Sequence, residues 1–157
     1  MSPSGLVSAL AACASVLAAS AGGRQAAHAS APAAVTLTVT ITGARSAAGE
    51  LGVAVFGDPA GFPEDEAKAL RRLVTSVDPA TAGARVTFPG LPAGTYAVAV
   101  RHDVNRNGRL DKNFLGIPTE GYGVSNNPPP RLRSPRFDEA AFTIGADHAI
   151  TIALIHR

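Results

Sequence analysis

The sequence contains no tryptophan and only one cysteine, Cys13. Aromatic residues make up 5% of its 157 residues, whereas Val, Ile, Leu and Thr occur in short runs separated by Gly and Pro, which favours β-strands over helices. The formal net charge is only +2 and the basic residues are scattered, so the sequence does not indicate the concentrated basic face of a nucleic-acid-binding protein. A chain of this length suits one domain.

Residues 1–29 are predicted to be an export signal peptide. Leu6–Ala19 is apolar and rich in alanine, and Ala27-His28-Ala29 offers a cleavage pattern of small residues. The run is too short for a convincing transmembrane anchor, although the first five residues lack the positive charge that a signal normally carries. We therefore expect residues 30–157 to form a single periplasmic or secreted domain with no transmembrane span in the mature chain.

An alternative for the N-terminal segment is a lipid anchor at Cys13. The preceding Leu10-Ala11-Ala12 resembles the site at which bacterial lipoproteins are cut and acylated, but the hydrophobic run before it is very short and apolar residues continue after it. Cleavage after Ala29 instead would leave a mature chain without cysteine. Disulfides, thiol catalysis and cysteine-ligated metal sites would then be excluded.

Alternating apolar and polar residues predict most of the strands. Val35–Thr42 alternates throughout, so its aliphatic side chains should face a core and its threonines should face water. Residues 51–56 repeat the pattern and are predicted to pair with this strand as a hairpin. Further strands are predicted at residues 86–88, 95–100, 141–144 and 149–154.

One helix is predicted after Pro63. Acidic residues at positions 64–66 would fill its first turn and basic residues at positions 68, 71 and 72 its last, which is the charge order that the helix dipole favours. Ala67 and Leu70, together with Leu73 or Val74, could form its apolar stripe. We expect this helix to cover one edge or end of the sheets.

These elements predict an all-β fold, an antiparallel β-sandwich with one short helix and a long ordered loop. Residues 86–100 include Leu91-Pro92-Ala93-Gly94-Thr95-Tyr96 between two strands. This stretch resembles the hairpin of transthyretin-like and collagen-adhesin B-type sandwich domains. The resemblance implies a transthyretin-like or immunoglobulin-like sandwich and carries no activity.

Residues 101–127 are predicted to form the long loop. Oxygen-bearing side chains recur through its first half and glycines interrupt its second half, so no regular strand or helix is expected to run through it. Its large apolar residues, such as Phe114 and Tyr122, argue against disorder. Loops of this length inside a compact domain are usually functional.

The first half of this loop resembles a calcium-binding loop. Asp103, Asn105, Asn107, Gly108 and Asp111 fall at positions 1, 3, 5, 6 and 9 of an Asp-x-Asn-x-Asn-Gly pattern. The carbonyl of Arg109 would serve at the seventh position, but Phe114 replaces the bidentate Glu of an EF-hand. Any Ca²⁺ binding should therefore be weak, with a Kd of about 10⁻⁴ to 10⁻³ M. The alternative is that these side chains form tight turns without a metal.

We hypothesise that the loop of an exported module binds an envelope or extracellular ligand or partner. The candidate ligand-binding residues are His102, Asp103, Glu120, Tyr122, Asn126 and Asn127. One alternative is a hydrolase in which His102 acts as a general base with Asp103 or Glu120; no established nucleophile, phosphate-binding or metalloprotease motif supports it. Another alternative is a structural envelope protein without a small ligand.

Several motifs together resemble one bacterial family of exported proteins, domain of unknown function family 2141. They are Gly61-Phe62-Pro63, Leu91–Tyr96, His102-Asp103 with Asn105, Asn107-Gly108 and Asp111, Asn113–Pro118, Glu120–Gly123 and Ser125–Asn127. The resemblance extends from about Val35 to Leu154. It implies an exported sandwich domain without a cofactor and implies no known activity.

Overall fold

The computed structural model describes residues 34–157. The predicted signal peptide and Cys13 lie outside the described residues. The strands are β1 Val35–Thr42, β2 Glu50–Phe56, β3 Arg71–Thr75, β4 Ala84–Leu91, β5 Gly94–Asp103, β6 Gly121–Val124, β7 Phe142–Ile144 and β8 His148–Ala153. A 3₁₀ turn, η1 Glu66–Lys68, and one helical turn, α1 Phe137–Ala140, complete the elements. Within residues 34–157 no helix combines the length and apolarity needed to cross a membrane.

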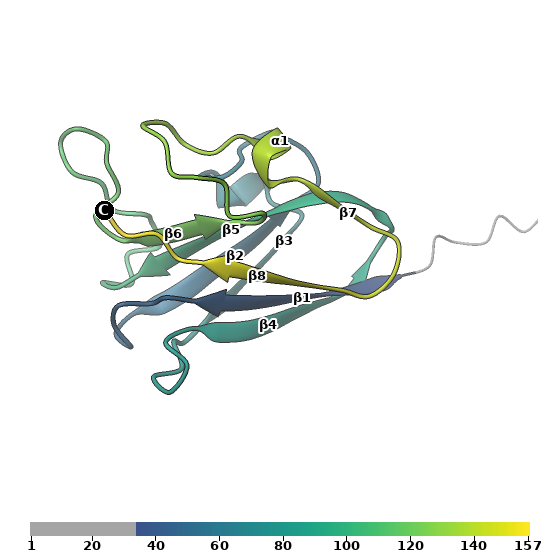
Figure 1. Cartoon of the computed structure of the whole chain (residues 1–157), viewed down its shortest axis with the longest axis horizontal. Helices are drawn as coiled ribbons and strands as arrows, with labels where there is room; N and C mark the ends of the chain where they lie inside the picture. The colour runs from purple at the N-terminus through teal and green to yellow at the C-terminus, as the bar shows by residue number, and fades with distance from the viewer. Residues whose placement is uncertain (1–33) are drawn as a thin grey trace, which may run out of the picture.

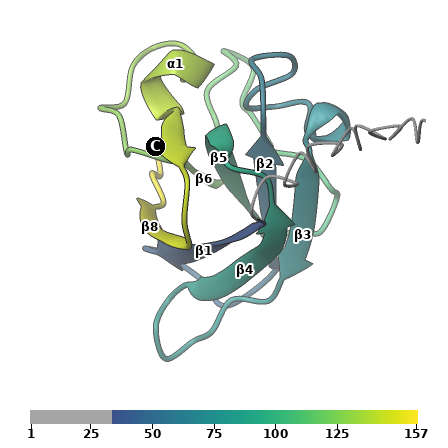
Figure 2. The same ribbon diagram turned by 90° about the vertical axis from the view of Figure 1, so that its right-hand side faces the viewer.

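The strands form two sheets that pack as a β-sandwich, which confirms the predicted all-β fold (Figures 1 and 2). The smaller sheet has the order β4-β1-β8, and the larger sheet has the order β3-β2-β5-β6, with β7 pairing the start of β5. All pairs are antiparallel except β1 with β8, which is parallel. The first and last strands are therefore neighbours.

The predicted hairpin between β1 and β2 is wrong. β1 lies between β4 and β8 in the smaller sheet, whereas β2 lies between β3 and β5 in the larger one. The connection at residues 43–49 therefore crosses from one sheet to the other. Both strands bury an aliphatic face, and packing those faces against each other across the sandwich satisfies the same sequence pattern that a hairpin would.

The main core lies between the two sheets. The burial of β1 alternates as its sequence predicts, with the four aliphatic side chains at 35, 37, 39 and 41 buried and the intervening threonines partly exposed. Alternate residues of β2 and β5, including Val53, Val98 and Val100, face them from the larger sheet. The layer of side chains between the two sheets is thus aliphatic. The outer face of the larger sheet takes no part in this core and can contact other segments of the chain.

The predicted helix after Pro63 is also wrong. Only Glu66–Lys68 forms a single 3₁₀ turn, and the chain then enters β3, which pairs along β2 from Val55↔Arg71 to Leu51↔Thr75. Leu73 packs against the main core, whereas Val74 on the opposite face of the strand is exposed. This alternation shows that the apolar residues follow a strand period in the second half of the segment.

A second apolar cluster covers one end of the outer face of the larger sheet. The ring of Phe62 lies edge-on to Phe56 at a centroid distance of 5.3 Å and to Phe137 at 5.8 Å. These rings attach the segment after β2 and the turn α1 to the sheet. The other end of this outer face is not covered by the cluster, and the candidate site lies there.

Candidate functional site

The long loop is shorter than the sequence predicts. β5 continues to Asp103, and Gly121–Val124 forms β6, which pairs with β5 from His102↔Gly121 to Ala99↔Val124. The loop therefore comprises residues 104–120. Gly49, at φ +81°, allows the connection before β2 to approach its base so closely that a Cβ at this position would lie 2.1 Å from the carbonyl oxygen of Asp103.

Two buried carboxylates fix the backbone of this loop. Asp103 accepts hydrogen bonds from the backbone N–H of Asn107 at 3.0 Å and of Gly108 at 2.6 Å. Glu120, which is 8% exposed, accepts one from Val104 at 2.8 Å and one from Asp111 at 3.0 Å. Four backbone donors that no strand satisfies are thus bonded to ionisable groups of the same segment.

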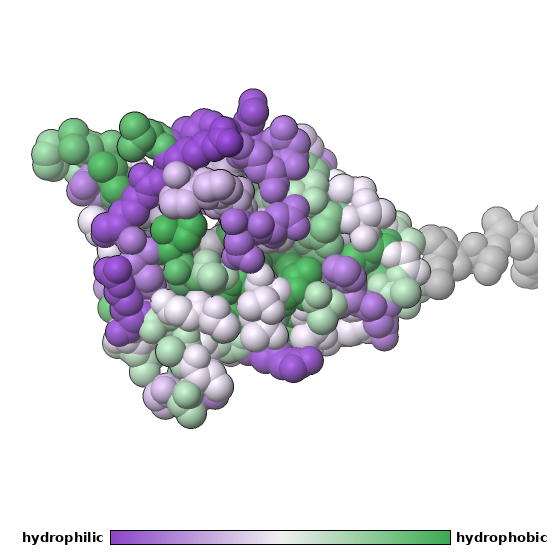
Figure 3. Space-filling view, viewed as in Figure 1, coloured by the Kyte–Doolittle hydropathy of each residue, from purple (hydrophilic) through white to green (hydrophobic). Residues whose placement is uncertain are grey.

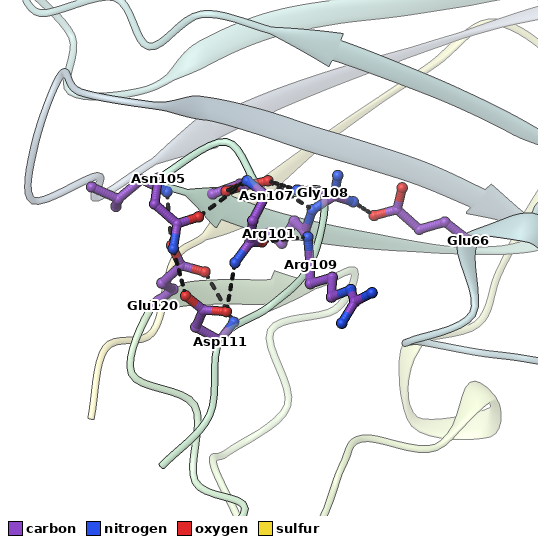
Figure 4. A network of polar contacts seen from close by, with 10 residues as sticks. Glu66, Arg101, Asn105, Asn107, Gly108, Arg109, Asp111 and Glu120 are labelled. Atoms are coloured by element: carbon purple, nitrogen blue, oxygen red, sulfur yellow. Dashed lines mark hydrogen bonds and ion pairs between the residues drawn. The ribbon is translucent and has the colours of Figure 1, made fainter.

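Asp111 closes the outer part of the loop (Figure 4). Its two oxygens accept hydrogen bonds from the side-chain amides of Asn105 at 2.7 Å and Asn107 at 2.8 Å. The oxygens of the same amides accept backbone N–H groups of Asn107 and Arg109, which are the expected side-chain turns. The spacing that resembles a calcium loop therefore belongs to a loop, residues 104–120, whose polar side chains bond to its own backbone and to one another. We call it the polar loop. Asp103, Asn105, Asn107 and Asp111 do come together there.

All six carboxylate oxygens of Asp103, Asp111 and Glu120 accept an N–H group of the loop. Within residues 34–157 no group of three or more His, Cys, Asp or Glu side chains is arranged to hold a metal ion. A Ca²⁺ ion would have to replace several of these donors. Calcium binding stays a prediction for this loop.

Calorimetric titration with Ca²⁺ is expected to give at most weak binding, with a Kd of about 10⁻⁴ to 10⁻³ M, because only two formal charges and amide ligands are offered. Asp111→Ala should remove this heat. The matched control is Asp147→Ala, which removes a carboxylate outside the loop and should leave the titration unchanged. A Kd below about 10⁻⁶ M would contradict the expectation of weak binding.

The predicted ligand-binding residues do not converge. His102 is buried, and its Nε2 lies 2.9 Å from the carbonyl oxygen of Ala48. Successive side chains of a strand point to opposite faces, so His102 and Asp103 lie on opposite sides of β5. Glu120 is committed to backbone N–H groups. The geometry therefore does not support His102 as a general base with Asp103 or Glu120, and the hydrolase alternative stays a prediction.

Two more of the predicted residues serve the architecture. Asn126 donates its side-chain amide to the carbonyl of Ala141 at 2.8 Å, and Asn127 bonds both Thr151 and Ala153 at 2.9 Å. They connect the end of β6 to the β7 and β8 segments. Of the six predicted ligand-binding residues, Tyr122 alone lines the large groove described next.

A groove of about 920 Å³ lies over the uncovered part of the larger sheet. Its floor comes from β3, β5 and β6, and three segments that are separate in sequence form its walls: residues 63–67, 108–118 and 131–135. The last two belong to loops that project on the same side of the sandwich as α1 (Figure 1). The volume is that of a typical small-molecule site.

Arg101 crosses the sheet beneath this groove. The pairing register opposes Gly52 to Arg101 on one side and to Val74 on the other, and a Cβ at Gly52 would lie 2.7 Å from the guanidinium carbon. The glycine thus provides the space through which Arg101 reaches Glu66 of η1, with which it forms an ion pair. Its Nε lies 3.9 Å from Asp103, so this side chain connects the groove to the polar loop.

Glu64 connects all three walls. Its Oε1 lies 2.8 Å from the Lys112 ammonium and accepts the Ser134 hydroxyl at 2.6 Å. The hydrogen bond from Lys112, followed by that from Ser134, holds the pKa of Glu64 below its ordinary value. The carboxylate is therefore ionised at neutral pH, and the loops on either side are joined at one point.

Basic residues outnumber acidic ones along the groove. Seven of its lining residues are basic and two, Glu64 and Glu66, are acidic. The basic residues are Arg72, Arg101, Arg109, Lys112, Arg131, Arg133 and Arg157. Arg133 forms a two-pronged ion pair with Glu139, whose pKa it lowers to about 2 with help from the backbone N–H of Arg136. Arg72 and Arg109 form no ion pair with any residue that the structure describes.

Arg109 illustrates what the sequence pattern did not reveal. The pattern assigns its carbonyl to a metal ion, whereas its side chain lines the groove and extends away from the polar network (Figure 4). The sequence pattern does not predict the groove, because its lining residues come from four separate parts of the chain. The sequence offers only a weak signal, the glycine Gly52 inside an otherwise apolar strand, because such a glycine marks close approach by another group.

A family model described as an uncharacterized protein conserved in bacteria (DUF2141) matches residues 39–152. The match includes the polar loop and most of the segments that line the groove. Searches of curated proteins and of solved structures gave no match.

Proposed function

The chain belongs to the DUF2141 family of uncharacterized bacterial proteins, whose description names no activity, and we propose a function for it from the groove. In this proposal the protein is an exported binding module for an anionic ligand that also has an apolar part. The observation that carries the proposal is the groove of about 920 Å³ with seven basic and two acidic lining residues. The polar loop is the wall that positions Arg109 and Lys112.

The electrostatics support an anionic ligand. Arg72 and Arg109 line the groove without a carboxylate partner among residues 34–157, so a ligand could bond both without breaking an existing ion pair. Guanidinium groups suit carboxylate and phosphate oxygens because their N–H groups form a planar fork. Both side chains are exposed, so each bond to a ligand contributes modestly and the two together hold its anionic end.

The apolar part of the ligand is inferred from the side chains between these cations. They are Val74, Ala99, Leu110, Leu115, Ile117, Val124 and Leu132. Ala99 on the floor leaves room above the sheet. The sequence pattern of residues 1–29 supports export, so we expect such a ligand in the periplasm or outside the cell.

Octyl phosphate, used below its micelle concentration, is a suitable probe, with octanol as the neutral match. Protein recovered from the periplasm or medium is expected to bind octyl phosphate and to bind octanol at least tenfold more weakly, because only the phosphate can bond the arginines. The double variant Arg72→Ala/Arg109→Ala should weaken octyl phosphate binding by at least about tenfold, measured by calorimetry.

The matched control is Arg85→Ala, which removes an exposed arginine from β4 in the other sheet. It lowers the net charge without changing the groove and should leave the affinity unchanged. Equal affinity for octanol and octyl phosphate, or an equal loss in Arg85→Ala, would contradict the proposal. Recovery of the protein from the cytoplasm alone, with Met1 retained, would contradict export. A structural envelope protein would bind neither probe.

A further inference from the structure

Three of the largest exposed apolar side chains occupy the tips of the two loops beside the groove. Phe114 and Leu115 lie in the 104–120 loop and are 95% and 67% exposed, and Leu132, between β6 and α1, is 96% exposed. Figure 3 shows hydrophobic surface protruding at the end of the molecule where these loops project, beside a largely hydrophilic rim. Large apolar side chains that gather at one end of a molecule, unlike single scattered ones, mark a surface for a protein or membrane partner.

The first tip is a closed turn of the backbone. The side-chain oxygen of Asn113 accepts the N–H groups of Leu115 and Ile117, both at 3.0 Å. The backbone of Asn113 also bonds to both Ile117 and Gly116 at 2.9 Å. The turn therefore presents its two apolar side chains outward while most of its own N–H groups are satisfied, which lowers the cost of placing it in a less polar medium.

Cations surround both tips. Lys112 precedes Phe114 by two residues, and Arg131 and Arg133 stand on either side of Leu132. Glu64 pairs with Lys112, and Glu139 pairs with both Arg131 and Arg133, so two carboxylates face three cations. Arg109 and Arg157 line the same groove and form no ion pair with a described residue. Apolar tips with a cationic surrounding complement a bilayer that has anionic headgroups over an apolar interior.

We propose that Phe114, Leu115 and Leu132 insert into the surface of an anionic lipid bilayer and dock the protein there. A stable protein partner would need a continuous interface of roughly 800 Å² on this side, whereas the exposed apolar surface here is confined to the adjacent pair Phe114 and Leu115 and to Leu132, each beside basic residues, which suits insertion between anionic headgroups. Leu115 and Leu132 also line the groove, whereas Phe114 does not, so Phe114 is the residue at which this inference can be tested apart from the proposed groove ligand.

The test is sedimentation with vesicles made of equal parts phosphatidylcholine and phosphatidylglycerol. The wild-type protein, as processed by the cell, is expected to co-sediment with these vesicles and to bind phosphatidylcholine vesicles much more weakly. Phe114→Ser should lower the partition coefficient by at least about tenfold, because it removes an aromatic side chain that the bilayer would bury. Added salt should weaken both proteins equally, since it screens the charges they share.

Leu70→Ser is the matched control. Leu70 is 45% exposed and belongs to neither tip, so this change should leave vesicle binding unaltered. The affinity for octyl phosphate should be the same in Phe114→Ser as in the wild type, which separates this inference from the groove proposal. Three results would overturn it: no binding of the wild type to anionic vesicles, equal binding of Phe114→Ser, or self-association in the absence of lipid that Phe114→Ser abolishes.

Discussion

Asp103→Ala is expected to destabilise the protein by about 3 kcal/mol, because it removes a buried carboxylate that accepts two backbone N–H groups. It also leaves the nearby Arg101, which is 11% exposed, with Glu66 as its only carboxylate partner within the described chain. Chemical denaturation of the purified variant measures the change in the free energy of unfolding. Hydrogen exchange should show faster exchange at Asn107 and Gly108.

Asp111→Ala is the matched control within the same loop. Its carboxylate accepts only the exposed side-chain amides of Asn105 and Asn107, and water can replace it. The expected loss is below about 1 kcal/mol. Equal destabilisation by the two substitutions would show that burial of the Asp103 carboxylate is not what stabilises the loop.

Gly49→Ala is expected to cost at least about 3 kcal/mol, from two causes that add. The residue has φ +81°, where a side chain is strained, and its new Cβ would lie 2.1 Å from the carbonyl oxygen of Asp103 and 2.5 Å from the Cα of Val104. These backbone atoms cannot move away from the new Cβ as the end of a flexible side chain could. The connection between the sheets and the base of the polar loop must therefore separate, which thermal or chemical unfolding will detect.

Gly90→Ala separates the two causes. Gly90 has φ +74°, but a Cβ there meets no atom within 4 Å. This control should lose only the conformational part, about 1–2 kcal/mol. If Gly49→Ala costs no more than Gly90→Ala, the close approach of residue 49 to the start of the loop is not significant for stability.

The fold class could be predicted from local patterns, but the pairing could not. The alternation in Val35–Thr42 is strict, and every buried position of β1 follows it. An alternating pattern shows that one face of a strand is buried, but it does not identify the sheet to which the strand belongs. The predicted hairpin between β1 and β2 is therefore wrong. The segment after Pro63 was misassigned because Leu70 and Leu73 fit a helical stripe, whereas Leu73 and Thr75 also fit the strand alternation that pairing with β2 selects.

The polar loop could be predicted because its determinants are close in sequence. The spacing of Asp103, Asn105, Asn107 and Asp111 forms turns whether or not a cation is bound, so the pattern identifies the loop without deciding its ligand. The position of His102 could not be predicted, since its environment depends on Ala48 from another connection. The groove depends on long-range register, which one sequence does not encode in a local pattern.

The parallel pairing of β1 with β8 has a consequence for how this chain reaches its native state. β1 forms the middle of the smaller sheet, and its neighbour on one side, residues 148–153, is synthesised long after it. Before that segment emerges, one edge of β1 has no partner and the aliphatic layer beneath stays incomplete. Acquisition of the native topology therefore follows synthesis of β8, with a rate limited by closure of the very long segment between β1 and β8.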